Sequence, residues 1–294
     1  MAFISMPQML SKARQAKYGV GYFECWNIES TRAVISAANE EGSPVIIGFN
    51  GTILKEHGCE LEYYAAVGKI AVEKAQVPVG LILNEASSFE QIVEGIRAGF
   101  SSVMIDGSSM SFEDNAKLTR RVVEVAHSVG VFVEGQLDQL PCAKEGVLLE
   151  SVAKNNMTDP RKARDFVEQT GIDALSVSVG NVHILYNQQT ELDCEHVREI
   201  AAAVGIPLVV HGGTGIADDS IKKAIESGIC KVNIGTGLRS AFTAGMRKAI
   251  EGNPSVGPEE VLESGELELK AFVKKKMRVY GSSGKAVLEC RSAT

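Results

Sequence analysis

Eight short apolar segments, rich in Val, Ile and Leu, recur along the 294-residue chain and alternate with longer amphipathic segments. Strands buried on both faces have this nearly continuous apolar character. The expected strands are residues 20–25, 44–49, 78–83, 102–106, 131–137, 174–180, 207–212 and 231–235. Segments with helical periodicity lie between them, for example residues 30–42, 88–99, 112–130 and 219–228. Strands that alternate with helices pair in parallel, so we expect one (β/α)8 barrel, a TIM barrel, over residues 1–294. An open doubly wound sheet is the alternative, and periodicity alone does not separate the two.

Two segments depart from this rhythm. Residues 138–160 form a long excursion after the fifth expected strand. Such a loop is typical of a mobile lid that covers the barrel mouth, and a surface insertion is the alternative. Residues 258–281 form an extra C-terminal helical segment, which we expect to pack outside the barrel or to serve oligomerisation.

Composition excludes several classes of protein. The net charge of −7 lacks the basic excess of a general nucleic-acid binder. We find no signal peptide at the N-terminus and no apolar run of the roughly 18 residues that a membrane span needs. The six cysteines lack CxxC spacing, which is typical of reduced thiols, so we expect a cytoplasmic protein.

Polar side chains gather where the apolar strands end. In barrels this C-terminal face of the strands carries the active site. Six of the eight strands contribute such a residue, which is a convergent pattern. The residues are Asn84, Glu85, Asp106, Glu134, Gln136, His183, His211 and Asn233.

Two histidines follow neighbouring strands of the expected barrel. His183 follows the sixth strand and His211 ends the seventh, so their imidazoles can share a metal ion. Glu85 is the natural third ligand and Glu134 the reserve. Spacing alone leaves open a second interpretation, in which both histidines are hydrogen-bonded and hold no metal.

Glycine-rich loops follow the seventh and eighth strands. The segments 211–225 and 231–242 each run from a strand through small residues into a helix. Backbone N–H groups at such a helix start favour an anion, and barrels often bind phosphate with these two loops. The alternative is that these glycines only make turns.

The chain also resembles the class II fructose- and tagatose-bisphosphate aldolases over nearly its whole length. This resemblance implies a dimeric or tetrameric barrel that cleaves ketose bisphosphates to dihydroxyacetone phosphate and an aldehyde, with a zinc ion polarising the ketone. The matching segments are residues 43–47, 99–115, 122–137, 158–160, 171–183, 207–216, 231–242 and 281–286.

The resemblance assigns roles to individual positions. His183 and His211 match two zinc ligands of the family, and Asp106 also matches. The phosphate-binding positions that it implies are Gly180, Gly212, Gly213, Thr214, Asn233, Ile234, Gly235 and Thr236.

This chain departs from the family pattern after the third strand. Asn84 stands where the family has its catalytic aspartate, and Glu85 stands where it has the third zinc histidine. An amide cannot titrate, and a carboxylate ligand leaves open zinc, another divalent metal or none.

Other family positions are changed as well. Gln136, Ile184 and Pro141-Cys142 replace a Glu, a Gly and a Gly-Gly, and Lys144 takes the place of an acidic loop residue, next to Glu145. We therefore expect a divergent ketose-phosphate aldolase with Asn84 and Glu145 as catalytic residues and Glu85, His183 and His211 as metal ligands. A phosphosugar isomerase or epimerase and a non-catalytic phosphosugar-binding paralogue remain the alternatives.

Overall fold

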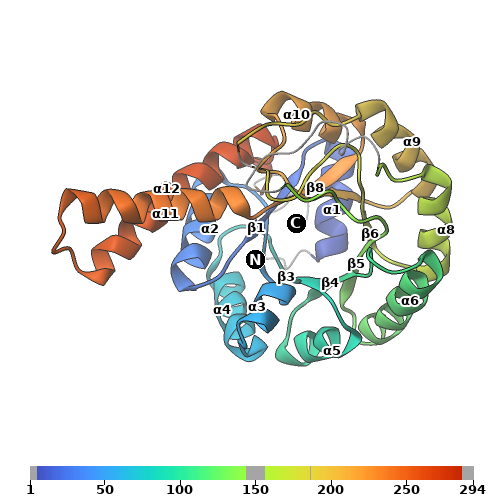
Figure 1. The fold of residues 1–294 in the computed structure, drawn as a ribbon, viewed down its shortest axis with the longest axis horizontal. Coiled ribbons are helices and arrows are strands. Elements are labelled where there is room, and N and C mark those ends of the chain that lie inside the picture. The colour runs from blue at the N-terminus through green and yellow to red at the C-terminus, as the bar shows by residue number, and fades with distance from the viewer. Residues whose placement is uncertain (1–4, 144–155, 186, 287–294) are drawn as a thin grey trace, which may run out of the picture.

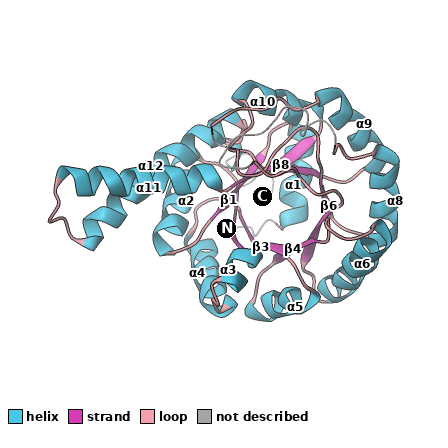
Figure 2. Ribbon diagram, viewed as in Figure 1, coloured by secondary structure: helices cyan, strands magenta, loops and turns pink. Residues whose placement is uncertain are grey.

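Eight parallel strands close into a barrel in the order β1 to β8, with β8 hydrogen-bonded to β1. The computed structural model describes residues 5–143, 156–185 and 187–286. Figures 1 and 2 show the strands as an inner ring surrounded by helices, which confirms the barrel and excludes the open sheet. The strands are β1 (Val20–Glu24), β2 (Val45–Asn50), β3 (Val79–Ala86), β4 (Ser102–Asp106), β5 (Phe132–Gln136), β6 (Ala174–Ser176), β7 (Leu208–Val210) and β8 (Ile229–Ile234).

The sixth and seventh strands are shorter than the sequence predicted. Residues 177–180 and 211–212 belong to loops instead, and this places His211 just beyond β7. The helices are α1 (Met6–Ala16), α2 (Ile28–Glu41), α3 (Gly51–Glu56), α4 (Leu61–Lys74), α5 (Phe89–Ala98), α6 (Phe112–Ser128), α8 (Pro160–Thr170), α9 (Cys194–Val204), α10 (Asp218–Ser227), α11 (Thr236–Gly252) and α12 (Pro258–Val279).

Helix α1 closes the N-terminal end of the barrel. Its buried residues Met6, Met9 and Leu10 belong to one apolar cluster with strand residues such as Ile46 and Ile82. Figure 1 shows α1 within the ring of strands. The opposite, C-terminal end of the strands is therefore the open mouth of the barrel.

Helices α11 and α12 project together from one side of the barrel (Figure 1). The expected C-terminal helical segment is thus present, and charged pairs fasten it to α2. Arg32 pairs with Glu266, and Arg278 Nη2 lies 2.7 Å from Glu41 Oε1. Within the described residues, no helix is long and apolar enough to span a membrane.

The excursion after β5 is described only at its two ends. Residues 138–143 and 156–160 are placed, whereas Lys144 and Glu145 lie outside the described residues. Pro141 O accepts a hydrogen bond from His183 N at 2.8 Å, and Ala143 N donates to His183 O at 2.9 Å. The start of this loop therefore holds the backbone of His183.

Candidate active site at the barrel mouth

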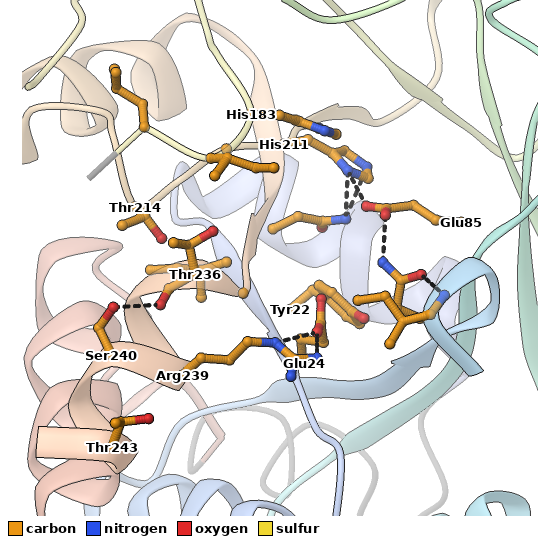
Figure 3. Close-up of a pocket in the computed structure, with 18 of the residues that line it drawn as sticks. Tyr22, Glu24, Glu85, His183, His211, Thr214, Thr236, Arg239, Ser240 and Thr243 are labelled. Carbon is orange, nitrogen blue, oxygen red and sulfur yellow. Dashed lines mark hydrogen bonds and ion pairs between the residues drawn. The ribbon is translucent and has the colours of Figure 1, made fainter. Parts of the chain in front are cut away.

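A cavity of about 1020 Å³ opens at the C-terminal ends of the strands. Residues at the ends of β1, β2, β3, β4 and β8 line it, together with the loops after β6 and β7 and one face of α11. Figure 3 shows these side chains converging from separate elements. The expectation that polar strand ends would meet at one site is therefore met for Glu85, Asp106, His183, His211 and Asn233.

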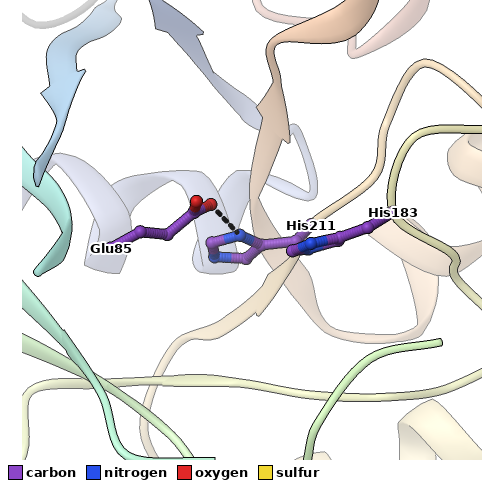
Figure 4. A group of neighbouring side chains, drawn as sticks. All are labelled: Glu85, His183 and His211. Carbon is purple, nitrogen blue, oxygen red and sulfur yellow. Dashed lines mark hydrogen bonds and ion pairs between the residues drawn. The ribbon is translucent and has the colours of Figure 1, made fainter. Parts of the chain in front are cut away.

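Glu85, His183 and His211 form a group that can hold a metal ion. Each offers one ligand atom, and these atoms all lie within 4.8 Å of one another. The two imidazole rings stack with centroids 5.8 Å apart, and Nδ1 of His211 lies 3.2 Å from Oε1 of Glu85 (Figure 4). Two imidazoles and a carboxylate are a common ligand set for zinc and for non-haem iron.

The backbone at Glu85 is unusual for a strand. Its φ is +52°, and the pairing of β3 with β4 shifts register between Leu83 and Ala86. Such bulges are frequent beside active sites, because they redirect a side chain. Thr52 Oγ1 donates to Glu85 O at 2.8 Å, and Asn50 Nδ2 donates to Glu85 Oε2 at 2.5 Å. The carboxylate is thus aimed at His211 and held there.

Ile184, next to His183, has a similar left-handed conformation. Its φ is +57°, and its side chain is half exposed and lines the cavity. Residues held in this region cost about 1–3 kcal/mol, and they concentrate at functional sites. Among the described residues that line the cavity, the two non-glycine residues with a left-handed backbone are therefore one member of this candidate metal group and the neighbour of another.

Glu134 occupies the other side of His211. Its Oε1 lies 3.1 Å from His211 Nε2, and its Oε2 lies 2.7 Å from Lys231 Nζ. Glu134 was the reserve metal ligand in the sequence prediction, but it lies against the nitrogen of His211 that faces away from Glu85. A carboxylate in this position fixes the ring of a metal-binding histidine and increases its basicity.

Burial and charge set the ionisation of these groups. Burial alone raises the pKa of Glu85, but His211, His183 and Asn50 outweigh it and bring that pKa to about 2. Burial lowers the pKa of His183, which favours the neutral ring that binds metals. Burial also opposes protonation of His211, yet Glu134 and Glu85 together raise its pKa. This surplus of negative charge around His211 suits a cation.

The loop after β7 approaches its neighbours too closely for a side chain. Gly212 has a φ of +72°, and a Cβ there would lie 2.2 Å from Val182 O. Gly213 N donates to Asn233 O at 2.9 Å, so the loops after β7 and β8 are tied together. Thr214 Oγ1 accepts from Gly237 N at 2.8 Å.

The loop after β8 ends directly at helix α11. Gly235 is the N-terminal cap of that helix, and Thr236 is its first residue. Gly212, Thr214 and Asn233–Thr236 all line the cavity. We call the residues 212–214 and 233–236 the anion cradle, because the N-terminus of α11, where no side chain caps the helix, favours an anion here.

Not every candidate from the sequence lines the cavity. Asn84 is buried beneath it, and its Nδ2 donates to Glu85 Oε1 at 3.1 Å. Gly180 is also set back from the cavity, and its φ is +102°. Gly213 contributes through its bond to the second loop. Glu145 lies outside the described residues.

The structure adds three residues that the sequence did not single out. Tyr22 and Glu24 come from β1 and Arg239 comes from α11, and all three line the cavity. Burial raises the pKa of Glu24, although Arg239 opposes that shift. The hydroxyl of Tyr22 is buried and has no hydrogen-bond partner among the described residues. In sequence, Tyr22 and Glu24 sit within an apolar strand and Arg239 within a helix, so no local signal marked them.

Comparisons with known proteins agree with this geometry. Residues 4–285 match the family model for class-II fructose-bisphosphate aldolase. A fructose-bisphosphate aldolase of Geobacillus stearothermophilus is 40% identical over 288 residues, 97% of this chain and 99% of the relative. A sulfofructosephosphate aldolase of Alkalicoccus urumqiensis is 34% identical over 287 residues, 97% of this chain and 99% of the relative.

A solved structure has the same fold. The crystal structure of the YdjI aldolase from Escherichia coli K12 superposes with a TM-score of 0.82 at 32% sequence identity, covering 97% of this chain and 99% of that one. The family model and the relatives thus span nearly the whole barrel, including the metal-site residues and the anion cradle. The chain therefore belongs to the class II fructose-bisphosphate aldolase family of lyases.

Proposed function

We propose that this protein is a divergent metal-dependent aldolase that cleaves a ketose phosphate to dihydroxyacetone phosphate and an aldehyde. One observation carries the proposal: Glu85, His183 and His211 line the same cavity as the anion cradle. A cation site beside an anion site suits a substrate whose ketone lies next to a phosphate ester.

The anion cradle holds the phosphate in this proposal. Backbone N–H groups of the cavity-lining residues Gly212, Thr214, Gly235 and Thr236 bind the phosphate, and the N-terminus of α11 points its dipole at it. The phosphate fixes one end of the sugar, so the ketone is presented to the imidazoles. Gly180 supports this shape from outside the cavity.

Glu85, His183 and His211 would hold the divalent metal, and Glu134 would orient His211. Such an ion, zinc or iron by its ligand set, supplies Lewis-acid chemistry that polarises the ketone and stabilises the enediolate. The protein's own residues fix where that charge develops. Glu85 is held ionised by its neighbours, and His183 is held neutral by burial.

Cleavage breaks the C3–C4 bond, leaves its electron pair on the enediolate and releases the proton of the C4 hydroxyl. The enediolate then takes up a proton at C3, so the number of protons is unchanged. Asn84 cannot accept a proton, and we propose that it positions the carboxylate of Glu85 instead. Glu145 is our candidate for the group that supplies the proton.

Asn84 also favours a second candidate function. A phosphosugar isomerase or epimerase would stabilise the same enediolate and move a proton without breaking a C–C bond. That reaction does not need a base at the C4 hydroxyl, which is the role of the replaced aspartate in the family.

Dihydroxyacetone phosphate in heavy water separates these functions. Exchange of a C–H proton, together with condensation onto an added aldehyde, supports the aldolase. Exchange without condensation over a broad aldehyde panel supports the isomerase. If the metal-loaded protein gives neither reaction, both functions are wrong and a phosphosugar-binding protein remains. Protein stripped of metal by a chelator is the matched control.

We further propose that residues 1–294 act as one domain in a cytoplasmic homodimer or homotetramer. The projecting α11 and α12 support this assembly, because Ile250 and Leu267 on them are 48% and 60% exposed. Light scattering on the purified protein measures the number of subunits. A monomer at micromolar concentration contradicts the proposal.

A further inference from the structure

The cavity has a second wall, opposite the metal-site histidines, that the proposed chemistry does not use. It is formed by Glu24 at the end of β1, Asn50 at the end of β2 and Arg239 on α11. We call these three residues the distal wall. In Figure 3, Glu24 and Arg239 lie together, below the two histidines. A sugar held by its phosphate in the anion cradle has to place its far end somewhere in the same cavity.

Arg239 is committed to Glu24 within this wall. Its Nε lies 3.2 Å from Glu24 Oε1, and its Nη2 bonds to the same oxygen. Its guanidinium also lies over the Trp26 ring, with Cζ 4.9 Å from the ring centroid. Both contacts hold the side chain in one place. The only guanidinium of the distal wall is therefore already paired with a carboxylate.

The carboxylates nearby keep the wall from being an anion site. A Cβ on Gly235 would lie 2.8 Å from Glu24 Oε2, so this oxygen faces the loop after β8. Asn50 donates to Glu85, which places a second carboxylate next to the wall. A phosphate brought to Arg239 would meet the Glu24 carboxylate, and like charges in contact discriminate strongly against a ligand.

Among the described residues, the other cations that line the cavity lie farther out on α11. Arg247 and Lys248 follow Arg239 by eight and nine residues, about 12–14 Å along a helix. Lys248 also pairs with Glu268 at 3.2 Å. A six-carbon sugar held in the anion cradle does not extend that far.

We propose that Glu24 is a specificity-determining residue that rejects a second phosphate, so that the substrate is a ketose 1-monophosphate with an uncharged, hydroxylated tail. This inference rests on the proposed function. The tail hydroxyls donate to Glu24 and accept from Asn50 and Arg239. The relatives named fructose-bisphosphate aldolase act, by that name, on a sugar with two phosphates, so the inference separates this protein from them.

Direct binding tests the inference without requiring catalysis. Calorimetry with fructose 1-phosphate and fructose 1,6-bisphosphate gives the ratio of their dissociation constants. We expect the metal-loaded wild-type protein to bind the monophosphate more tightly. Glu24→Gln removes the negative charge with little change in shape, and we expect it to tighten bisphosphate binding about tenfold or more. Monophosphate binding changes much less, so the ratio inverts.

Two further variants identify the cause. Adding Arg239→Gln to Glu24→Gln removes the freed cation, and we expect the gain in bisphosphate binding to disappear. Glu266→Gln is the matched control, because it breaks a Glu–Arg pair, with Arg32, far from the cavity. It leaves the ratio unchanged. If Glu24→Gln does not fold, Glu24→Asp keeps the charge and the wild-type preference.

Each outcome decides the inference. It is wrong if the wild-type protein prefers the bisphosphate, if Glu24→Gln leaves the ratio unaltered, or if neither sugar binds. A purely structural role of Glu24 would weaken both ligands together and leave their ratio constant. Proton exchange of dihydroxyacetone phosphate reports separately on the proposed function. If no proton exchanges but the ratio of dissociation constants is as expected, the proposed aldolase function is wrong and the specificity inference stands.

Discussion

Oε2 of Glu134 lies 2.7 Å from Nζ of Lys231, and both side chains are enclosed inside the barrel. Burial lowers the pKa of Lys231, and the Glu134 carboxylate opposes that shift. Breaking such a pair leaves one charge without a partner, which costs about 3–5 kcal/mol. We therefore expect Lys231→Met to lower the free energy of unfolding by about that amount, measured by denaturant titration.

The control for this prediction removes both charges. In Lys231→Met with Glu134→Gln, the amide oxygen can still accept a hydrogen bond from His211. We expect most of the lost stability to return, because a neutral pair replaces a buried carboxylate that has lost its lysine. A double variant no more stable than Lys231→Met would contradict this account of the pair.

Metal content tests the site at His211. We expect His211→Ala to lose most of its bound metal, measured by atomic absorption after dialysis, because it removes one of the three proposed ligands. Glu134→Gln should weaken metal binding by about 10–100-fold, the usual effect of losing the group that orients a ligand. His127→Ala is the control, since His127 pairs with Asp173 elsewhere. Unchanged metal in His211→Ala refutes its role.

Gly212 is expected to be irreplaceable in the anion cradle. In Gly212→Ala, a left-handed backbone costs about 1–2 kcal/mol, and the new Cβ collides with Val182 O at 2.2 Å. Phosphate binding, measured by calorimetry, should be lost. Gly130→Ala has almost the same φ, +73°, with no atom within 4 Å, so it carries the strain without the collision. Equal effects of both variants would rule out the collision.

Restoring the family residues after β3 should restore family chemistry. The variant Asn84→Asp with Glu85→His supplies a titratable group and a third imidazole. Histidine is among the residues that tolerate the positive φ found at position 85. With both changes made in the Glu24→Gln background, which admits a second phosphate, we expect cleavage of fructose or tagatose bisphosphate to rise roughly 100-fold over Glu24→Gln alone, measured by a coupled assay. No gain over Glu24→Gln alone would count against the mapping of these two positions.

Acid should loosen the attachment of α12 to α2. Hydrogen bonding from Arg278 lowers the pKa of Glu41, and the folded state therefore gains stability above the pKa of the unfolded chain, near 4.5. That stability is lost as the pH falls below this value. Between about pH 6 and pH 3, we expect the free energy of unfolding to fall by about 1 kcal/mol less in Glu41→Gln than in the wild-type protein. Parallel losses in the two proteins would contradict this role.

The sequence predicted that Glu85, His183 and His211 would meet because each lies at or just beyond the C-terminal end of a strand. Once the alternation of strands and helices implies a barrel, the ends of neighbouring strands must meet, and His183 and His211 do so. The meeting of the loops after β7 and β8 at the cavity was predictable for the same reason, since their glycines stand between a strand and a helix. In both cases, a residue's place in the repeating pattern was sufficient.

Other contacts depend on the closed barrel and leave no local signal. Glu134 and Lys231 are 97 residues apart, and each interrupts a strand that is otherwise largely apolar. Glu24 and Arg239 are 215 residues apart and meet because β8 returns to β1. Helix α1 was missed because its amphipathic stretch precedes the first strand, outside the repeat. Pairing across the closure of a barrel is a tertiary property.

Helix α1 gives the interior of this barrel one direction of access. Helix α1 covers the N-terminal end of the barrel. In the described structure, bulk water therefore approaches the buried charges of Lys231, Glu134 and Glu85 from the mouth. A molecule that fills the mouth then lowers the local dielectric constant around all of these charges at once. Ligand binding and the strength of the internal ion pairs are thereby coupled, without any movement of the backbone.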